Sequence, residues 1–307
     1  MGISIRGWGL ALPEKIVTND DLAQTLDTSD EWIRERTGIH ERRIGGTTSG
    51  LATEAAQRAI EVADVDPSTI DMLVVATTSP DQQVPGTSAT VQHALGLTCG
   101  AVDMNAACSG FVYGLTYAAG LAAIGAKRVL VVGAETLSRI TDWDDRGTAI
   151  LFADGAGAAV VDAVDGPGSL LGWDLGADGS LVHVLYADIG GYLQMNGKEV
   201  FRQAIKVMAE SSKAALERAG LTPDDVDVVI PHQANTRIIE ASMTRLGVPY
   251  EKAVITLHRT GNTSAASIPM ALVEGIESGR VNEGDVVLLV GFGAGMTSAS
   301  AVLRWGA

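Results

Sequence analysis

The sequence predicts an α/β fold built from two copies of one unit, because a helix, a proline-started turn and an apolar strand occur twice. Residues 59–75 carry the first copy and residues 215–230 the second, at a constant spacing. Residues 128–133 and 286–291 form another pair of similar apolar strands. Uninterrupted apolar runs of this kind are typical of parallel strands that are covered on both faces.

A cysteine lies between a strand and a helix in the first unit. Cys108 follows the strand-like run 101–105 and precedes a long uncharged, helix-like run, 111–126. The N-terminus of a helix carries partial positive charge, which favours a thiolate over a thiol. The position therefore suits a nucleophile, although a cysteine taken alone is more often a buried packing residue.

The two units join at the turn-rich stretch 164–169, and we therefore divide the chain into residues 1–165 and 166–307. The residue that lies one repeat spacing after Cys108 is Ser264, in another glycine-containing turn that opens a helix. If the halves pack about a pseudo-twofold axis, these two turns face each other.

The second unit has three candidate functional segments. His232 directly follows the apolar strand 226–230, at the end of a strand where α/β sheets place ligands. Asn262 lies in a turn, and the glycine-rich stretch 291–295 offers backbone N–H groups to a phosphate or an oxyanion. Each also has an ordinary structural interpretation, as a histidine bonded to nearby backbone or as a turn residue.

Composition restricts the classes of function. The formal net charge of -15 repels nucleic acid and anionic membranes, so neither is expected as a partner. Only two cysteines occur and the N-terminus has no export pattern, which predicts a cytoplasmic protein without a disulfide framework. The uncharged run 104–126 is long enough for a membrane span, but its glycines, tyrosines and Asn105 favour a helix buried between two layers of a large fold.

Seven ordered motifs resemble the 3-oxoacyl-acyl-carrier-protein synthase III family, and the resemblance extends from about residue 5 to residue 305. The motifs are DTSDEWI at 27–33, RTGI at 36–39, AACSGF at 106–111, DRGT at 145–148, DGAGA at 154–158, PHQAN at 231–235 and GNTSAAS at 261–267. The resemblance implies the thiolase fold, a five-layered α/β/α/β/α arrangement of two similar halves, usually in a homodimer. Residues 1–165 would carry the nucleophilic cysteine, and residues 166–307 the histidine and asparagine.

The resemblance also implies a mechanism. Cys108 takes an acyl group from acyl-CoA as a thioester, and His232 and Asn262 hold the enolate that forms when malonyl-acyl-carrier protein loses carbon dioxide. The backbone N–H groups of Cys108 and Ala294 form the oxyanion hole. The product is a 3-oxoacyl-carrier protein, which initiates fatty acid synthesis; acyl-CoA and malonyl-carrier protein are substrates, and no cofactor or metal is expected.

Two binding surfaces follow from the resemblance. The CoA nucleotide is expected at Thr28, Trp32, Arg36, Arg146 and Asn235, with the adenine between Trp32 and Arg146. An acidic carrier protein needs a basic docking site on this acidic chain, although these cations are also interpretable as a solvated charged face. The expected docking residues are Arg202, Gln233, Ala234, Asn235, Thr236, Arg237 and Arg245, with Lys206 one turn from Arg202.

The chain departs from the family pattern in two places. The stretch 181–196, which helps line the acyl tunnel, is shorter than in many members, and His258 stands where many have an acidic residue; we assign His258 no role. Val84 is expected to reach the acyl tunnel, in the dimer that of the partner. Members that favour acetyl-CoA often carry phenylalanine there, so valine predicts a longer or branched primer.

Two rival functions remain open at the level of sequence. One is a related Cys-His-Asn acyltransferase or condensing enzyme of specialised metabolism, and the other is a non-catalytic partner subunit. A thiolase is excluded because the second half contains no cysteine, and elongating synthases carry a histidine where Asn262 stands. The non-catalytic reading is disfavoured because the chain keeps Cys108, His232 and Asn262 together.

Overall fold

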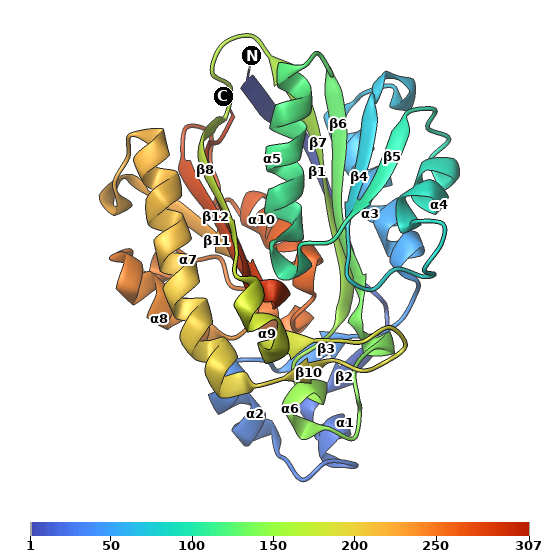
Figure 1. The fold of residues 1–307 in the computed structure, drawn as a ribbon, viewed down its shortest axis with the longest axis vertical. Helices are drawn as coiled ribbons and strands as arrows, with labels where there is room; N and C mark the ends of the chain where they lie inside the picture. The colour runs from blue at the N-terminus through green and yellow to red at the C-terminus, as the bar shows by residue number, and fades with distance from the viewer. Residues whose placement is uncertain (1, 307) are drawn as a thin grey trace.

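The structure is a computed structural model that describes residues 2–306, and it contains two main sheets with helices on their faces (Figure 1). The five-stranded sheet has the order β1-β7-β6-β4-β5. Its strands are β1 (Gly2–Ala11), β4 (Met72–Ala76), β5 (Gly100–Met104), β6 (Arg128–Thr136) and β7 (Asp154–Val164). The four-stranded sheet has the order β11-β12-β13-β8, with β8 (Leu170–Ala177), β11 (Val228–Pro231), β12 (Val286–Gly293) and β13 (Thr297–Arg304).

The two sheets repeat one arrangement of strands. In the first sheet β4 pairs with β6, β6 with β7 and β7 with β1, and in the second β11, β12, β13 and β8 pair in the same succession. In both, the first pair is parallel and the next two are antiparallel. This agreement confirms the predicted duplication of an α/β unit. Strand β5, which pairs in parallel with β4, is an additional strand at one edge of the first sheet.

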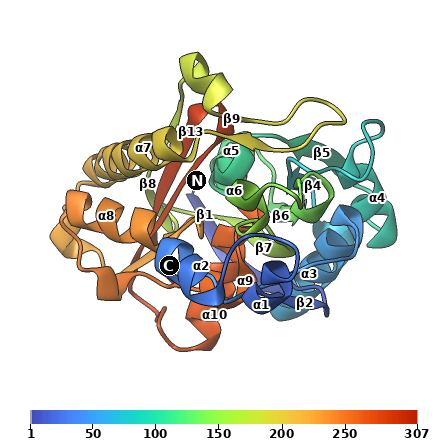
Figure 2. The same cartoon turned by 90° about the horizontal axis from the view of Figure 1, so that it is seen from below.

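Three layers of helices alternate with the two sheets (Figures 1 and 2). Leu73 and Val75 face the outer helices of the first half, whereas Val74 between them faces the central helices. In the second sheet Val229 faces the outer helices and Ile230 the central ones. The layers confirm the five-layered α/β/α/β/α arrangement. The outer helices are α3 (Thr48–Ala63) and α4 (Thr87–Ala94) on one side and α7 (Gly197–Ala219) and α8 (Thr236–Leu246) on the other, and the central ones are α5 (Gly110–Ala123) and α10 (Ser267–Glu277).

Helix α5 is buried on one side only. Phe111 and Leu115 lie in the core, but Tyr117 is 41% and Ile124 82% exposed. The helix lies between the two sheets, as expected, but nothing in residues 2–306 covers the face that carries Tyr117. None of the helices described in this range combines the length and the apolar character that spanning a membrane requires.

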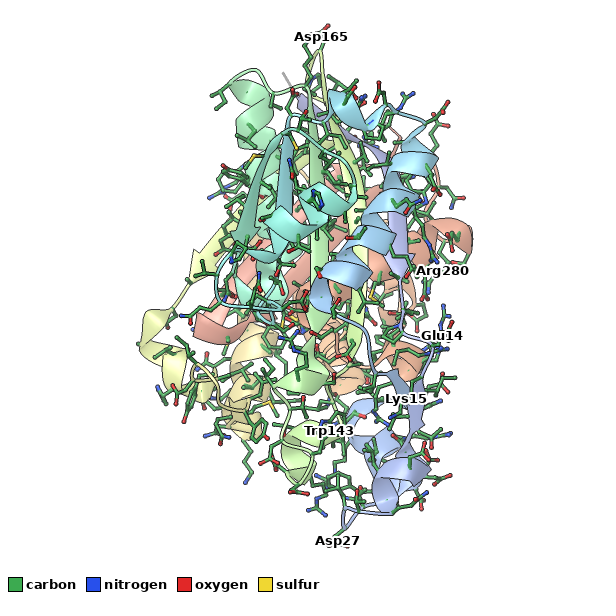
Figure 3. All side chains as sticks on the ribbon, turned by 90° about the vertical axis from the view of Figure 1, so that its right-hand side faces the viewer. Glu14, Lys15, Asp27, Trp143, Asp165 and Arg280 are labelled. Carbon is green, nitrogen blue, oxygen red and sulfur yellow. The ribbon has the colours of Figure 1, made fainter. Side chains whose placement is uncertain are left out.

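Short elements gather at one end of the molecule, at the bottom of Figure 1. Asp27, in the loop before α2, and Asp165, in the turn between β7 and β8, lie at opposite ends (Figure 3). The short elements are β2 (Ile16–Thr18), α1 (Asn19–Ala23), α2 (Asp30–Thr37), β3 (Glu41–Arg43), α6 (Arg146–Ala149), β9 (Leu185–Tyr186), β10 (Gln194–Met195) and α9 (Leu257–Thr260).

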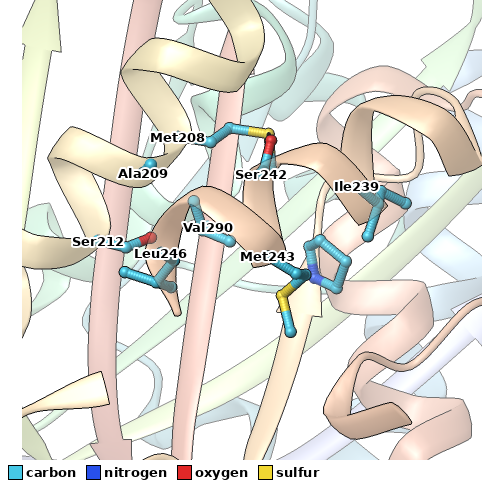
Figure 4. A pocket seen from close by; sticks show the side chains of 9 residues that line it. Met208, Ala209, Ser212, Ile239, Ser242, Met243, Leu246 and Val290 are labelled. Atoms are coloured by element: carbon cyan, nitrogen blue, oxygen red, sulfur yellow. Dashed lines mark hydrogen bonds between the residues drawn. The ribbon is translucent and has the colours of Figure 1, made fainter. Parts of the chain in front are cut away.

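A small apolar cavity remains where α7 and α8 pack on the second sheet (Figure 4). Its volume is about 10 Å³, which is room for the centre of a single water molecule. The cavity is a packing defect between helices and lies away from Cys108. Its lining residues are Met208, Ala209, Ser212, Pro231, Ile239, Ser242, Met243, Leu246 and Val290.

Candidate active site

Cys108 lies in a one-turn 3-10 helix, Ala107–Ser109, that links β5 to α5. The thiol therefore stands at the N-terminal end of a helix, as predicted, and the residue is 8% exposed. Ala107 has a φ of 47°, in the left-handed region that residues other than glycine avoid. Such a conformation costs of order 1 kcal/mol and persists where the surroundings hold it in place.

The resting charge of Cys108 differs from the sequence-based expectation. Burial raises the pKa of the thiol to about 12, the Ser264 hydroxyl opposes this rise, and the nearby Glu135 carboxyl adds to it. A rise from 9.0 to about 12 corresponds to about 4 kcal/mol, whereas a helix N-terminus contributes at most about 2 kcal/mol. Burial therefore outweighs the helix, and the resting residue is a neutral thiol.

The turn opposite Cys108 is the 3-10 helix Ser264–Ala266, which opens α10. Cys108 and Ser264 line the same cavity, so the prediction that the two turns face each other is confirmed. The residue-by-residue match was wrong by one position. Ser264 has the same φ of 47° as Ala107, so it matches Ala107, and Ala265 matches Cys108.

His232 follows β11 and is 1% exposed. Its Nδ1 lies 2.7 Å from the Ser267 Oγ, which also accepts a hydrogen bond from the Gln233 backbone N–H at 3.4 Å. Within residues 2–306 the Ser267 hydroxyl has no other recorded acceptor, so its proton goes to Nδ1. The ring proton then sits on Nε2. Burial lowers the pKa of His232 to about 3, so the ring stays neutral and can donate through Nε2.

Asn262 is oriented by hydrogen bonds on its backbone and side chain. Its N–H donates to the Leu151 carbonyl and its carbonyl accepts from the Ala153 N–H, both at 2.9 Å. Its side-chain Oδ1 accepts from the Ser264 N–H, also at 2.9 Å. Because the amide oxygen is occupied, the Nδ2 group is the part of the amide that remains available to a ligand.

Two cavities meet at Cys108. One, of about 260 Å³, is lined by Cys108, His232 and Asn262 and extends to Trp32 and Arg36 on α2. The second, of about 450 Å³, is largely apolar and includes both Cys108 and Ala294. Its other walls come from Thr78, Leu137, Ile140, Phe152 and the stretch 181–196, which contributes Val182, Leu185, Tyr186, Ala187 and Leu193.

The backbone donors expected of an oxyanion hole lie at the start of two short turns. Ala294 begins the 3-10 turn Ala294–Met296 after β12, and Cys108 lies in the first turn of its own short helix. N–H groups at such positions have no acceptor within their own turn. Gly293 permits the close approach, because a Cβ there would lie 2.6 Å from the Cys108 backbone nitrogen.

Of the residues expected to bind the nucleotide, Trp32 and Arg36 lie on α2 and Arg146 begins α6, whereas Thr28 precedes α2 and Asn235 caps α8. The guanidinium carbons of Arg36 and Arg146 lie 5.0 and 4.7 Å from the centre of the Trp32 ring, which is half-buried. Arg146 also donates from Nη1 to the Asp27 carbonyl at 2.6 Å. The Thr28 Oγ1 is buried and has no hydrogen-bond partner among the described residues. An adenine between Trp32 and Arg146 thus requires Arg146 to move away from the ring.

The expected docking residues divide into three exposed arginines and a buried loop. Arg202 on α7 pairs with Glu199 at 2.6 Å, and Arg245 on α8 pairs with Glu210 at 3.7 Å. The Arg237 guanidinium lies over the Phe201 ring, 5.5 Å from its centre. Phe201 lines the cavity that contains His232, so Arg237 stands at the mouth of that cavity.

Gln233 cannot contact a docked protein, which corrects the sequence-based assignment. The residue is 0% exposed. Its amide nitrogen donates to the Pro231 and Val254 carbonyls, and its amide oxygen accepts from two backbone N–H groups. The side chain therefore holds the His232 loop against the backbone before α9, at residues 254–257.

The rest of this loop is also engaged within the chain. Ala234 is 7% exposed and lines the cavity of His232. Asn235 caps α8 by accepting from the Arg237 N–H at 2.9 Å, and its Nδ2 donates to the Arg36 carbonyl at 2.8 Å. The Thr236 hydroxyl donates to the Thr37 carbonyl at 3.3 Å. These bonds fasten α8 to the end of α2.

Two further residues singled out from the sequence lie outside both cavities. Val84 is 82% exposed, in the loop before α4, and lines neither cavity of the single chain. His258 lies in α9, with its ring 6.0 Å from that of His40. Among residues 2–306, no cluster of three His, Cys, Asp or Glu side chains is arranged to hold a metal ion.

Sequence reasoning missed Ser267 and Glu135. Ser267 ends the GNTSAAS motif, and only the three-dimensional contact with His232 distinguishes it from the other small residues there. Glu135 is a fully buried carboxyl on β6 that accepts from Ser79 Oγ at 2.5 Å and from the Thr78 and Ala265 N–H groups. Burial raises its pKa. A charged residue within an apolar strand was the only available signal.

The chain is similar to known proteins over most of its length. Residues 102–179 match the family model described as 3-Oxoacyl-[acyl-carrier-protein (ACP)] synthase III, and residues 216–305 match the model of its C-terminal part. The beta-ketoacyl-[acyl-carrier-protein] synthase III of Geobacillus kaustophilus (strain HTA426) is 51% identical over 311 residues, which span 100% of both chains.

Solved structures agree over the whole chain. The 3-oxoacyl-[acyl-carrier-protein] synthase III from Aquifex aeolicus VF5 superposes with a TM-score of 0.97 at 45% identity, covering 99% of this chain and 100% of that one. The priming beta-ketosynthase from the R1128 polyketide biosynthetic pathway superposes with a TM-score of 0.93 at 38% identity, covering 99% and 96%.

Proposed function

The chain belongs to the 3-oxoacyl-[acyl-carrier-protein] synthase III family, and we propose that it condenses an acyl-CoA primer with malonyl-acyl-carrier protein to initiate fatty acid synthesis. One observation supports this reaction above all. Cys108 stands between an apolar cavity that suits an acyl chain and a second cavity that contains His232 and Asn262.

The first half-reaction is acylation of Cys108. The sulfur attacks the thioester carbonyl of acyl-CoA, and the thiol proton ends on the departing CoA sulfur, so that one thioester replaces another. The N–H groups of Cys108 and Ala294 stabilise the tetrahedral oxyanion. The acyl chain then extends into the apolar cavity of about 450 Å³.

The second half-reaction is decarboxylation of malonyl-carrier protein. When carbon dioxide leaves, negative charge develops on the thioester oxygen. His232 Nε2–H and Asn262 Nδ2–H are neutral donors whose orientation Ser267 and Ser264 set in advance. The enolate carbon then attacks the acyl-cysteine, and the Cys108 sulfur leaves with formation of a 3-oxoacyl-carrier protein.

Substrate binding uses the cavity of about 260 Å³, which extends from Cys108 to Trp32 and Arg36. Trp32, Arg36 and Arg146, with Thr28 and Asn235 close by, form the CoA nucleotide site, and Arg146 swings away from Trp32 to admit the adenine. The carrier protein docks near Arg237, with Arg202 and Arg245 at the periphery. No resident cofactor or metal takes part, and we assign the reaction to the cytoplasm.

We also propose a homodimer formed through β5 and α5. Strand β5 is an edge of its sheet, and beside it the exposed apolar side chains are Val84, Val102, Tyr117 and Ile124. An unpaired strand edge with apolar neighbours is a surface that soluble proteins normally cover. This interface would also bring Val84 to the acyl cavity of the partner subunit.

Two measurements test the proposed function. Incubation with mixed acyl-CoAs followed by intact-mass measurement should show one acyl group on Cys108, and acyl-CoA should raise the rate of carbon dioxide release from malonyl-carrier protein. Acylation without carbon dioxide release would instead favour an acyltransferase of specialised metabolism. The higher identity to the Geobacillus and Aquifex synthases than to the polyketide ketosynthase favours the condensation that initiates fatty acids.

A further inference from the structure

Arg42 is a fully buried cation on the short strand β3. Its guanidinium donates from Nη1 to the Val17 carbonyl at 3.1 Å, and from Nη2 to Asn19 Oδ1 at 2.8 Å and to the Ile150 carbonyl at 3.0 Å. Burial lowers the pKa of Arg42 to about 10, so it remains charged at neutral pH. It forms no ion pair within residues 2–306, and its Nε–H has no acceptor there.

An arrangement of this kind costs free energy. A buried charge loses its hydration, and a buried N–H without an acceptor adds a further desolvation penalty. Packing alone does not require an arginine at this position. The acceptors that Arg42 does engage therefore indicate what the residue contributes.

On one side, Arg42 holds the nucleotide elements. The Asn19 amide that accepts from Arg42 donates from Nδ2 to Asp30 Oδ1 at 2.9 Å and to the Ile39 carbonyl at 2.8 Å. Asp30 is the first residue of α2, the helix that carries Trp32. Through the Asn19 side chain, Arg42 is thus connected to Asp30 at the start of α2 and to Ile39 just after its end.

On the other side, Arg42 holds the segment that orients the catalytic asparagine. Ile150 caps the C-terminus of α6, the helix that begins at Arg146. Just after Ile150, the Leu151 carbonyl accepts from the Asn262 backbone N–H, and the Ala153 N–H donates to the Asn262 backbone carbonyl. Arg42 also packs directly on this turn, because a Cβ at Gly261 would lie 3.0 Å from the Arg42 Cβ.

We infer that Arg42 is a positioning residue that couples the nucleotide-binding helices α2 and α6 to the orientation of Asn262. The inference rests on the proposed function. The guanidinium fork fixes the Ile150 carbonyl, and with it residues 151–153, so that the position of α2 and α6 and the orientation of Asn262 depend on the same side chain. A lysine keeps the charge but has no rigid fork with which to engage three acceptors in different directions.

The test uses two half-reactions that need different parts of the site. Decarboxylation of malonyl-carrier protein requires Asn262 and no CoA nucleotide, and it is measured in a Cys108→Ala background. The KM for acyl-CoA in acylation of otherwise wild-type enzyme reports the nucleotide site. Each rate is divided by the folded fraction, read from the amplitude of thermal unfolding, so that a merely structural loss cancels.

We expect Arg42→Lys to slow decarboxylation about tenfold or more and to raise the KM for acyl-CoA several-fold. The matched control is Arg43→Lys on the same strand, whose side chain is partly exposed beside Glu41 and should change neither value. Unchanged decarboxylation per folded molecule, or a change in only one of the two values, overturns the inference.

A second variant keeps the test decisive if Arg42→Lys does not fold. Asn19→Ala releases Arg42 from the α2 side only, so the KM for acyl-CoA should rise more than decarboxylation falls. Kinetics equal to wild type in both assays overturn the coupling. If wild-type enzyme itself shows neither acylation nor carbon dioxide release, the proposed function fails, which is a separate and distinguishable result.

Discussion

Neutral groups carry the chemistry around Cys108. Burial keeps the resting cysteine as a thiol and His232 as a neutral imidazole, with pKa values of about 12 and about 3. In the proposed mechanism, stabilisation of the enolate therefore depends on the direction of two N–H donors rather than on a positive charge. Ser267 and the Ser264 N–H fix those directions.

This division of roles predicts opposite effects of substitution on the two half-reactions. Cys108→Ala should abolish acyl-enzyme formation and leave part of the decarboxylation. His232→Ala and Asn262→Ala should spare acylation and cost about 2–4 kcal/mol in decarboxylation. Intact mass and carbon dioxide release measure the two steps, and Cys99→Ala serves as the matched control. Equal loss of both steps in all three variants would contradict the assignment.

The buried histidine also predicts an unusual pH profile. With a pKa of about 3, His232 does not change protonation across the neutral range. Decarboxylation by the Cys108→Ala variant should therefore show no step near about pH 6.5, the ordinary pKa of histidine. The measurement is the rate between about pH 5.5 and 8, repeated with His258→Asn, which removes a histidine that lies outside both cavities. A step that persists in this control would contradict the neutral state assigned to His232.

At the scale of elements, helices α7 and α8 present arginines of different character. Arg202 and Arg245 pair with glutamates, whereas Arg237 forms no ion pair within residues 2–306 and lies over Phe201 at the cavity mouth. Of the three cations, Arg237 is therefore the one whose charge is most available to an acidic carrier protein.

We predict that Arg237→Glu raises the KM for malonyl-carrier protein about tenfold at low ionic strength and leaves acyl-CoA kinetics unchanged. Added salt should weaken docking of the wild type in the same way. Arg218→Glu, at the far end of α7 beside Trp173, is the matched control. Unchanged carrier-protein kinetics at low salt would identify this surface as a solvated charged face.

Local patterns predicted the elements better than their contacts. The repeated strands and the turns around Cys108 and Asn262 follow from apolar runs and glycines in the sequence, and the structure reproduces them. Gln233 was misassigned because its place in the PHQAN motif gave no sign that backbone groups of residues 231 and 254–257 would engage its whole amide. The single-residue shift at Ser264 escaped notice because a one-residue insertion leaves the composition of the turn unchanged.

Long-range partners were beyond the reach of sequence patterns. Arg42 contacts Ile150, far along the chain, and Glu135 contacts the 264–266 turn of the other half. Neither contact leaves a periodicity or a spacing in the sequence. The first contact becomes visible only when the first half is folded, and the second only when the two halves are packed together.

At the scale of the whole molecule, the single chain leaves an open face. Helix α5 exposes Tyr117, β5 is an edge strand, and Val84 projects from its loop without entering a cavity of its own chain. A second copy on this face would cover the apolar side chains and add a wall to the acyl cavity. Primer length would then depend on both subunits.

Val84 is where this dependence can be measured. Because valine is smaller than phenylalanine, the cavity has more room if Val84 of a partner subunit closes it, and each additional buried methylene contributes about 0.8 kcal/mol, roughly fourfold in specificity. Wild-type enzyme should therefore prefer a primer a few carbons longer than acetyl or branched. The stretch 181–196, whose side chains line the same cavity, would then set the opposing limit on length.

The test compares kcat/KM for acetyl-, isobutyryl-, hexanoyl- and dodecanoyl-CoA in the wild type, in Val84→Phe and in the neighbouring control Gln83→Phe. Val84→Phe should shift preference toward acetyl-CoA, because the ring fills the space that a longer chain needs, while Gln83→Phe should leave the order of primers unchanged. Sedimentation of each variant verifies that the dimer persists. Two results would contradict a role for Val84: a wild type that prefers acetyl-CoA, or a length profile that Val84→Phe does not alter. Either would mean that a single chain defines the depth of the cavity, through walls that include Leu137, Ile140 and Phe152.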